Sequence, residues 1–187
     1  SLSLAQQSRT ISWRIEVSRD FSRFSVPSLV ATAKDAGDDP HSTVYVSQAA
    51  GKLIICPTTS IEKGFYHEQQ PLSLIPWDTP AEILGQNVWE SLLLFRKIPS
   101  LNLRSGKKSD WPAYRASGLK SIRDFENQYV RVSVIAFSNA LRVEATVPGD
   151  MAEGLFVGRV ISNACEFEQL GDWIRLSSQC SMRIAEQ

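Results

Sequence analysis

Histidine and paired cysteines are scarce in this chain of 187 residues. It contains two histidines and three cysteines, and no two cysteines show the C-x-x-C spacing. An odd number of cysteines without this spacing argues against a disulfide framework and against a structural zinc site. We therefore expect Cys56, Cys165 and Cys180 to be free thiols in a reducing compartment.

An excess of one charge sign is also missing. The sequence has 20 Lys and Arg against 20 Asp and Glu, which gives a formal net charge of +0. A dedicated nucleic-acid-binding protein is usually basic, so we do not expect nucleic acid as the main partner.

Long apolar runs are absent too. The longest, ESLLLF at 90–95, is far shorter than the roughly 20 residues that cross a bilayer. The first residues, SLSLAQQSRT, lack the apolar core of a signal peptide. These features predict a soluble cytoplasmic protein without a membrane partner.

What the sequence does contain is alternation of apolar and polar residues, which is typical of half-buried strands. In TISWRIEV, for example, Ile11, Trp13 and Ile15 alternate with polar residues. Two pairs of such runs are separated by short turns and predict antiparallel hairpins. The expected strands lie at 10–17, 28–33, 43–57 (a hairpin), 129–137 and 140–147 (a second hairpin), 154–162 and 172–178.

Helices are expected between groups of strands. The clearest spans about 80–97, with Pro80 in its first turn and Pro99 after its end. A short helix is expected around 119–127, capped by Ser117 or Ser121, and another at 163–170. The fold class is therefore α+β, with a largely antiparallel sheet of about seven or eight short strands and two or three helices packed on it. We expect one domain over 10–187, preceded by a disordered or cloning-derived N-terminus at 1–9.

The sequence offers no catalytic motif. There is no phosphate-binding glycine loop, no nucleophile elbow and no set of metal ligands, so we expect neither enzymatic activity nor a cofactor or metal. His41 lies in DDPHS, where we expect a solvated turn. His67 stands beside Glu68 and can in principle pair with a cysteine in space, which leaves a cysteine-dependent enzyme as one alternative.

Two segments combine aromatic and charged residues. The segment 104–123 interleaves Trp111 and Tyr114 with basic residues, which fits a surface for single-stranded nucleic acid, a solvated loop or a protein interface. Trp, Tyr and Arg are the residues enriched at the centres of protein interfaces. The segment 62–77, expected to be a loop, has a similar mixture. The candidate partner-binding residues are Glu62, Tyr66, His67, Glu68, Asp110, Trp111, Tyr114 and Arg115.

The run WPAYRASGLKSIRDFE at 111–126, followed by the strand YVRVSV, resembles the immunity proteins of bacterial contact-dependent growth inhibition systems. STVYVSQAAGKLIICP and WDTPAEILGQNVWESLLLF fit the same resemblance, which spans about residues 43 to 161. It implies a cytoplasmic protein that binds the cognate toxin C-terminal domain of a surface-delivered effector, often a nuclease. Binding would block the active site of the toxin or its access to substrate. The resemblance carries no catalytic or contact residue over to this chain, and it leaves the oligomeric state open.

A basic nuclease as partner would favour acidic groups on the binding surface. The loop or helix carboxylates that can supply them are Asp38, Asp39, Glu62, Glu68, Asp110 and Asp124. In the segment 111–126 we expect Leu119, Ile122 and Phe125 to face inward. Trp111 and Tyr114 either anchor the short helix or face a partner, and the sequence leaves both alternatives open.

Overall fold

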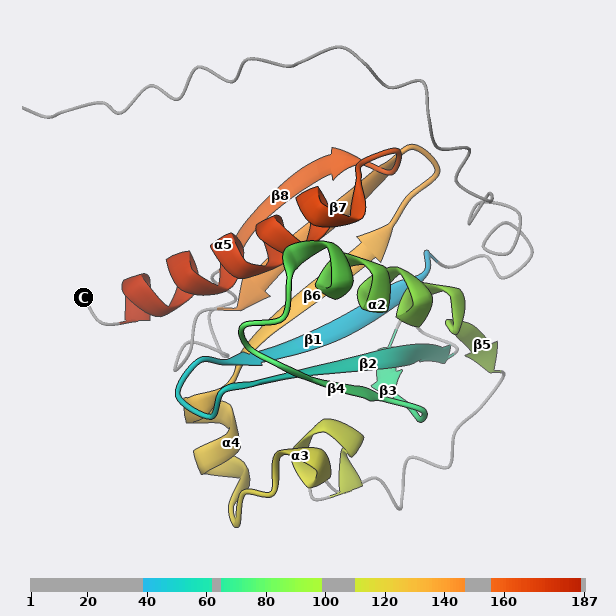
Figure 1. Ribbon diagram of the computed structural model, residues 1–187. Coiled ribbons are helices and arrows are strands. Elements are labelled where there is room, and N and C mark those ends of the chain that lie inside the picture. Colours follow the sequence, from blue (N-terminus) through green and yellow to red (C-terminus); the bar gives the residue numbers. More distant parts are fainter. Residues whose placement is uncertain (1–38, 62–64, 99–109, 147–155, 186–187) are drawn as a thin grey trace, which may run out of the picture.

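The computed structural model of the chain describes residues 39–61, 65–98, 110–146 and 156–185. The strands are β1 (His41–Ser47), β2 (Lys52–Ile61), β3 (Phe65–Glu68), β4 (Ser73–Pro76), β5 (Arg96–Ile98), β6 (Val130–Ala136), β7 (Ala140–Thr146) and β8 (Phe156–Ser162). The helices are α2 (Ala81–Leu93), α3 (Pro112–Ser117), α4 (Ile122–Gln128) and α5 (Phe167–Ala185). One sheet of eight strands with helices on both of its faces confirms the predicted α+β class (Figure 1).

Two hairpins form the centre of the sheet. Strand β1 pairs with β2 and β6 pairs with β7, and β1 also pairs with β6, so that the strand order is β3-β2-β1-β6-β7-β8. In this register Val44 lies opposite both Ile55 and Val132. All of these pairs are antiparallel. Both hairpins are those that the alternating sequence predicts.

Strand β2 is ten residues long and pairs with four other strands. Residues 52–55 pair with β1 on one edge and with β4 on the other, whereas residues 59–61 pair with both β3 and β5. Strands β3 and β4 therefore follow each other along one edge, and β5 runs parallel to β2 on the edge that β2 shares with β1. The prediction of a loop over 62–77 is wrong at 65–68 and 73–76, because four-residue strands are too short to show a clear period.

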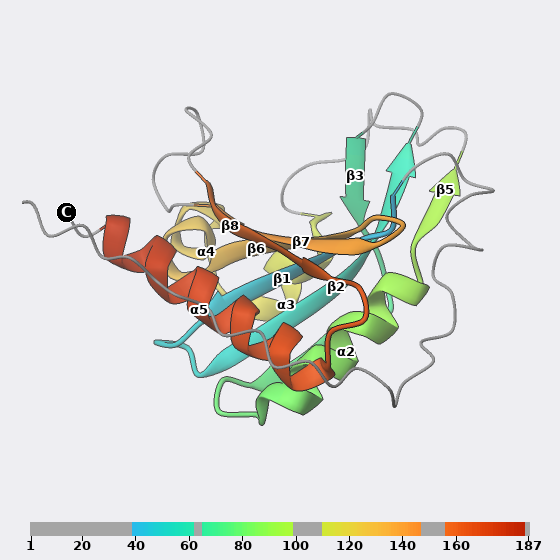
Figure 2. The ribbon, with the colours of Figure 1, turned by 90° about the horizontal axis from the view of Figure 1, so that it is seen from above.

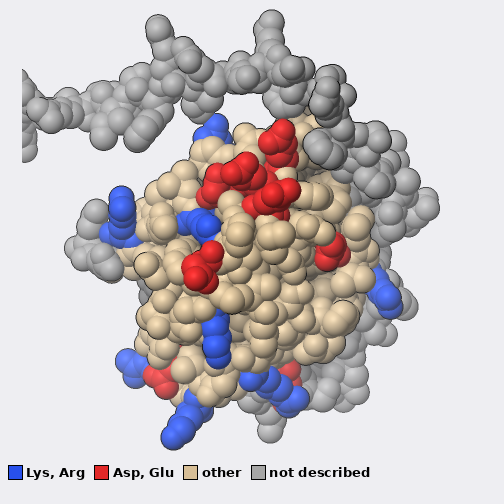
Figure 3. All heavy atoms as spheres, in the orientation of Figure 1, with Lys and Arg blue, Asp and Glu red and all other residues tan. Residues whose placement is uncertain are grey.

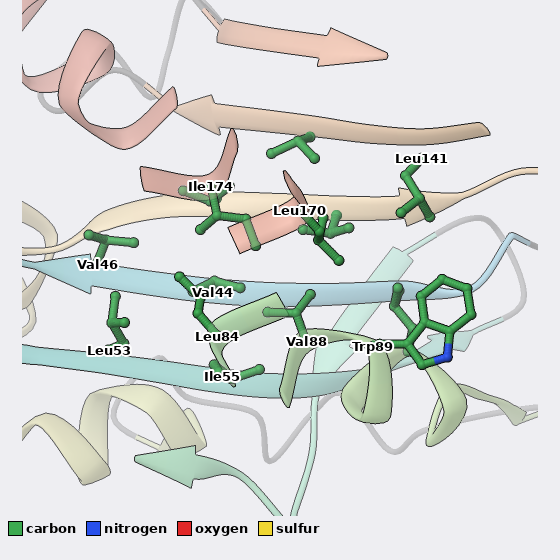
Figure 4. Packing of buried hydrophobic residues seen from close by; sticks show 14 of the residues in the cluster. Val44, Val46, Leu53, Ile55, Leu84, Val88, Trp89, Leu141, Leu170 and Ile174 are labelled. Carbon is green, nitrogen blue, oxygen red and sulfur yellow. The ribbon is translucent and has the colours of Figure 1, made fainter. Parts of the chain in front are cut away.

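Helices α2 and α5 cover one face of the sheet, and the main hydrophobic core lies between them and the strands (Figures 1 and 2). Alternate residues of β6 and β7 are buried on this face. Figure 4 shows Leu84 and Val88 of α2 close to Val44 and Ile55 of the sheet. The two helices run in opposite directions, since Gly85 lies against Phe167 and Gly171 lies against Ala81.

Helices α3 and α4 pack on the opposite face, over β1 and β2. A second and smaller cluster of buried residues joins them to the sheet: Tyr45, Ile54, Cys56, Ala113, Phe125 and Tyr129. The hydroxyl of Ser121 accepts a hydrogen bond from the backbone N–H of Asp124 at 3.0 Å and so caps α4. Phe125 is fully buried, whereas Leu119 and Ile122 are half-buried.

Three further expectations about elements are corrected. The strand expected at 172–178 lies inside α5, and the helix expected at 80–97 ends at Leu93 and is followed by β5. The helix expected at 163–170 begins at Phe167 and continues to Ala185, and the short helix α3 was not expected. The expected strands at 10–17 and 28–33, and the N-terminal segment 1–9, lie outside the described residues. No helix of the described ranges combines the length and the apolar character that crossing a membrane requires.

Candidate partner-binding site

The carboxylate of Glu68 joins the two sequence segments that supply the predicted partner-binding residues. One of its oxygens accepts a hydrogen bond from the hydroxyl of Tyr45, and Oε2 accepts one from the backbone N–H of Ala113 at 3.1 Å. Trp111, the residue that precedes α3, makes no capping hydrogen bond with its own side chain. Glu68, which lies 45 positions before Ala113 in the chain, therefore accepts the hydrogen bond of a backbone amide in the first turn of α3 and holds β3 against this helix.

Burial sets the protonation of this pair. Desolvation raises the pKa of Glu68, and the hydrogen bonds from Tyr45 and Ala113 act in the opposite direction. Burial, together with the neighbouring carboxylate of Glu68, raises the pKa of the Tyr45 hydroxyl well above its ordinary value. Tyr45 therefore stays protonated and donates, and both oxygens of Glu68 are engaged inside the protein. Its role in partner binding stays a prediction.

Tyr66 covers a buried histidine. Its ring packs edge-on against the ring of His41, with 4.5 Å between the ring centroids, while 38% of Tyr66 remains exposed. The expectation that His41 lies in a solvated turn is wrong, because His41 begins β1 and only 7% of it is exposed. The residues before it are polar, which suggested a turn, but Pro40 is buried as well and the strand begins directly after it.

The start of α3 carries a charged pair and two aromatic residues. Arg115 donates a hydrogen bond from Nη2 to Oδ1 of Asp110 at 2.6 Å, and both side chains are largely exposed. Trp111 is half-buried. Tyr114 is also half-buried and packs edge-on against Phe125, with 5.8 Å between ring centroids. This contact is what the anchoring alternative for Tyr114 requires.

We call the residues Tyr66, Asp110, Trp111 and Arg115 the β3–α3 surface. His67 follows Tyr66 in β3, so its side chain points to the other side of the strand. The hydrogen bond between Glu68 and Ala113 holds the two elements of this surface together. Of the other predicted residues, Glu62 lies outside the described residues, and Glu68 and Tyr114 make the internal contacts described above. The predicted residues of β3 and α3 thus belong to one region of the molecule.

Several of the carboxylates that were expected to attract a basic partner make contacts within the protein. Asp124 accepts a hydrogen bond from the Ser121 hydroxyl at the start of α4, and Asp110 is paired with Arg115. Asp39 is half-buried, and Asp38 lies outside the described residues. Exposed carboxylates instead gather over α2 and α5, on the face of the molecule that Figure 3 shows. They are Asp78, Glu82, Glu90, Glu166, Glu168 and Asp172, which we call the acidic face.

Two of the three thiols are held in the protonated form. Burial raises the pKa of Cys56 far above that of a free thiol and raises the pKa of Cys165 to about 11. All three cysteines are free, as expected. Within the described ranges, no group of three His, Cys, Asp or Glu side chains is placed to hold a metal ion.

Strands β6 and β7 carry a further, partly polar surface that was not predicted from the sequence. Tyr45 and Arg131 are register partners, so Arg131 lies on the α3–α4 side of the sheet, and Ser133 and Ile135 follow on the same side. Arg142 and Glu144 of β7 lie opposite Ile135 and Ser133. This surface follows from the same alternation of apolar and polar residues that predicts the two strands, because the polar positions of both strands fall on one side of the sheet.

Comparison with known proteins identifies similar folds only. No protein-family model and no curated protein matches the sequence. A protein of unknown function from Neisseria meningitidis superposes with a TM-score of 0.56 and 16% identity, over 76% of this chain and 94% of that one. A chain of the CdiA-CT/CdiI toxin and immunity complex from Yersinia pseudotuberculosis superposes with a TM-score of 0.58 and 12% identity, over 74% of this chain and 95% of that one.

Proposed function

We propose that this protein is an immunity protein of a contact-dependent growth inhibition system. It binds the C-terminal toxin domain of its cognate effector in the cytoplasm and blocks the active site of the toxin or its access to substrate. The observation that carries the proposal is the similarity of fold, over about three quarters of this chain, to a chain of a toxin and immunity complex. The resemblance of residues 43–161 to such immunity proteins supports it independently.

The β3–α3 surface supports binding to a protein. It presents a partly exposed tyrosine, a half-buried tryptophan and an exposed arginine on a framework fixed by Glu68. Such residues commonly form the centres of protein interfaces, where large side chains are buried with little loss of conformational freedom. A rigid framework lowers the entropic cost of association.

The test is calorimetry with the purified toxin domain encoded immediately upstream, at moderate salt. We expect one-to-one binding with a dissociation constant below micromolar and loss of toxin activity in the complex. Absence of binding at micromolar concentrations of both proteins would contradict the proposal. Binding that leaves the toxin fully active would contradict its inhibitory part.

A further inference from the structure

Strand β8 forms one edge of the sheet. Among the described residues it pairs with β7 alone, and all seven of its residues take part in this pairing. Figure 1 shows β8 as the last strand beyond β7. The backbone N–H and C=O groups on the outer side of an edge strand are not used by the sheet, and a further strand can pair with them. The edge of β8 is therefore open to one more strand.

Helix α5 carries apolar side chains on the flank beside this edge. The guanidinium of Arg159 in β8 lies 3.9 Å from the ring centroid of Trp173, so Trp173 marks the flank next to β8. Gly171 contacts α2 and marks the opposite flank. Leu176 and Ile184 follow three and eleven residues after Trp173 and lie on its side of the helix. They are 45% and 40% exposed, so this apolar flank has room for a covering layer.

One segment of the chain has the pattern that such a place requires. Residues 10–17, TISWRIEV, lie outside the described ranges and alternate apolar with polar side chains. As a strand, the segment has its apolar residues on one side and its polar residues on the other. The apolar ones are Ile11, Trp13, Ile15 and Val17. A strand of this kind needs both a neighbouring strand and a layer that covers its apolar side.

The chain is long enough to bring this segment to β8. The described residues begin at 39 and lead into β1, and its first residue His41 lies at the same end of the sheet as Ser162, the last residue of β8. Three strand spacings separate β1 from β8, which is about 15 Å. The 21 residues from 18 to 38 (38 − 17) span up to about 70 Å when extended. The segment therefore reaches the edge with chain to spare.

We propose that residues 10–17 form a ninth strand of the sheet, paired with the edge of β8, with their apolar side against the flank of α5 that carries Leu176 and Ile184. This inference does not depend on the proposed function. A segment of the same chain is favoured over a strand of the toxin or of a second copy, because its covalent link gives it a high effective concentration at the edge. The added strand prevents the edge from pairing with another chain.

The test is amide hydrogen exchange of the full chain, measured by mass spectrometry. We expect the amides of residues 11–17 to exchange at least about 100-fold more slowly than those of an unstructured chain. Leu176→Lys places a charge on the apolar flank and should speed this exchange at least about tenfold, while the amides of β6 stay protected. The matched control is Ile83→Lys, since Ile83 is 42% exposed on α2. Ile83 lies two residues before Gly85, which faces α5, and so points away from α5.

A second pair of variants changes the segment itself. Trp13→Lys, on the apolar side, should release residues 11–17, whereas Glu16→Lys, on the polar side, should leave their exchange within about twofold of the wild type. This pair decides the question if Leu176→Lys does not fold, which the amides of β6 report. Exchange of residues 11–17 at the unstructured rate in the wild type would overturn the inference. Protection that survives both Leu176→Lys and Trp13→Lys, or that is lost when the protein is diluted, would also overturn it, because the segment then lies elsewhere or on a second copy.

Discussion

A buried histidine with no hydrogen bond is costly, and in this protein the cost depends on pH. The folded state keeps His41 neutral down to about pH 4, whereas the unfolded chain takes up a proton near the ordinary pKa of 6.5. The stability linked to neutral His41 is therefore fully present above pH 6.5 and is lost as the pH falls toward 4. The difference between the two pKa values corresponds to about 3 kcal/mol at most.

We predict that His41→Phe removes most of this dependence on pH. Phenylalanine keeps a ring against Tyr66 but does not titrate, so the variant should lose about 3 kcal/mol less than the wild type between pH 7 and pH 4. The measurement is urea denaturation of both proteins at several pH values. The difference in their free energies of unfolding at each pH removes the contribution of the titratable groups that they share. Parallel stability curves would show that His41 gains its proton without cost in the folded state.

A second titratable residue with an altered pKa is Glu68, whose two carboxylate oxygens connect β3 to β1 and to α3. In Glu68→Gln one of the two acceptor oxygens becomes an NH2 donor, so either the O–H of Tyr45 or the N–H of Ala113 loses its acceptor. We predict a loss of about 1–3 kcal/mol in the free energy of unfolding. Glu166→Gln, at an exposed position before α5, is the matched control and should change stability by less than about 0.5 kcal/mol. Equal stability of the two variants would remove the capping role of Glu68.

Among the elements, α2 and α5 depend on two glycines for their close contact. A methyl group on Gly85 would overlap the carbonyl group of Phe167, and one on Gly171 would overlap that of Ala81. Both obstacles are backbone atoms, which cannot rotate away as a side chain can. The helices are therefore held at a separation that only glycine permits at these two points.

We predict that Gly85→Ala destabilises the protein by about 2 kcal/mol or more, although alanine favours helix by about 1 kcal/mol over glycine. Gly171→Ala should behave in the same way, and the double variant should lose less than the sum, because separating the helices once relieves both contacts. Thermal and urea unfolding measure these changes, with Gln179→Ala at an exposed position of α5 as control. An unchanged melting temperature in either variant would mean that the contact is looser than described.

The same two helices show what the sequence can and cannot predict. Both central hairpins are predictable because the alternation of apolar and polar residues that marks a half-buried strand is visible within each strand. Only the start of helix α5 was expected, because three of the positions on the buried face of its later turns are serines, Ser177, Ser178 and Ser181, which hide the apolar period of a helix. Two of them donate to backbone carbonyls, Ser178 to Arg175 and Ser181 to Thr146, and this satisfies their hydroxyls inside the core.

The candidate site was predictable in its residues but not in its assembly. Aromatic and charged residues mark both 62–77 and 104–123 in the sequence. Their contact depends on Glu68 reaching a helix of six residues that begins far away in the chain, and no local pattern contains this information.

The formal net charge of the whole molecule is zero, but its charged residues are not evenly distributed over the surface. The acidic face lies over α2 and α5, and Arg131 of β6 and Arg142 of β7 lie on the other side of the sheet. A layer of helix, about 10 Å across, and the sheet itself separate the two. At physiological salt the screening length is about 8 Å, so a partner at one face is largely screened from the charges of the other.

This separation predicts how charge variants affect association. If the toxin meets the side that carries the β3–α3 surface, Glu168→Gln with Asp172→Asn should change its association rate by less than about twofold at 0.15 M salt, and by more only when salt is lowered. Asn127→Lys with Gln128→Lys changes the net charge by the same amount. Both positions are exposed on α4, which lies on the same side of the sheet as the β3–α3 surface, so this variant should change the association rate more. Surface plasmon resonance over a range of salt gives both rates. Slower association of the first variant at 0.15 M salt, with little effect of the second, would place the toxin on the acidic face instead.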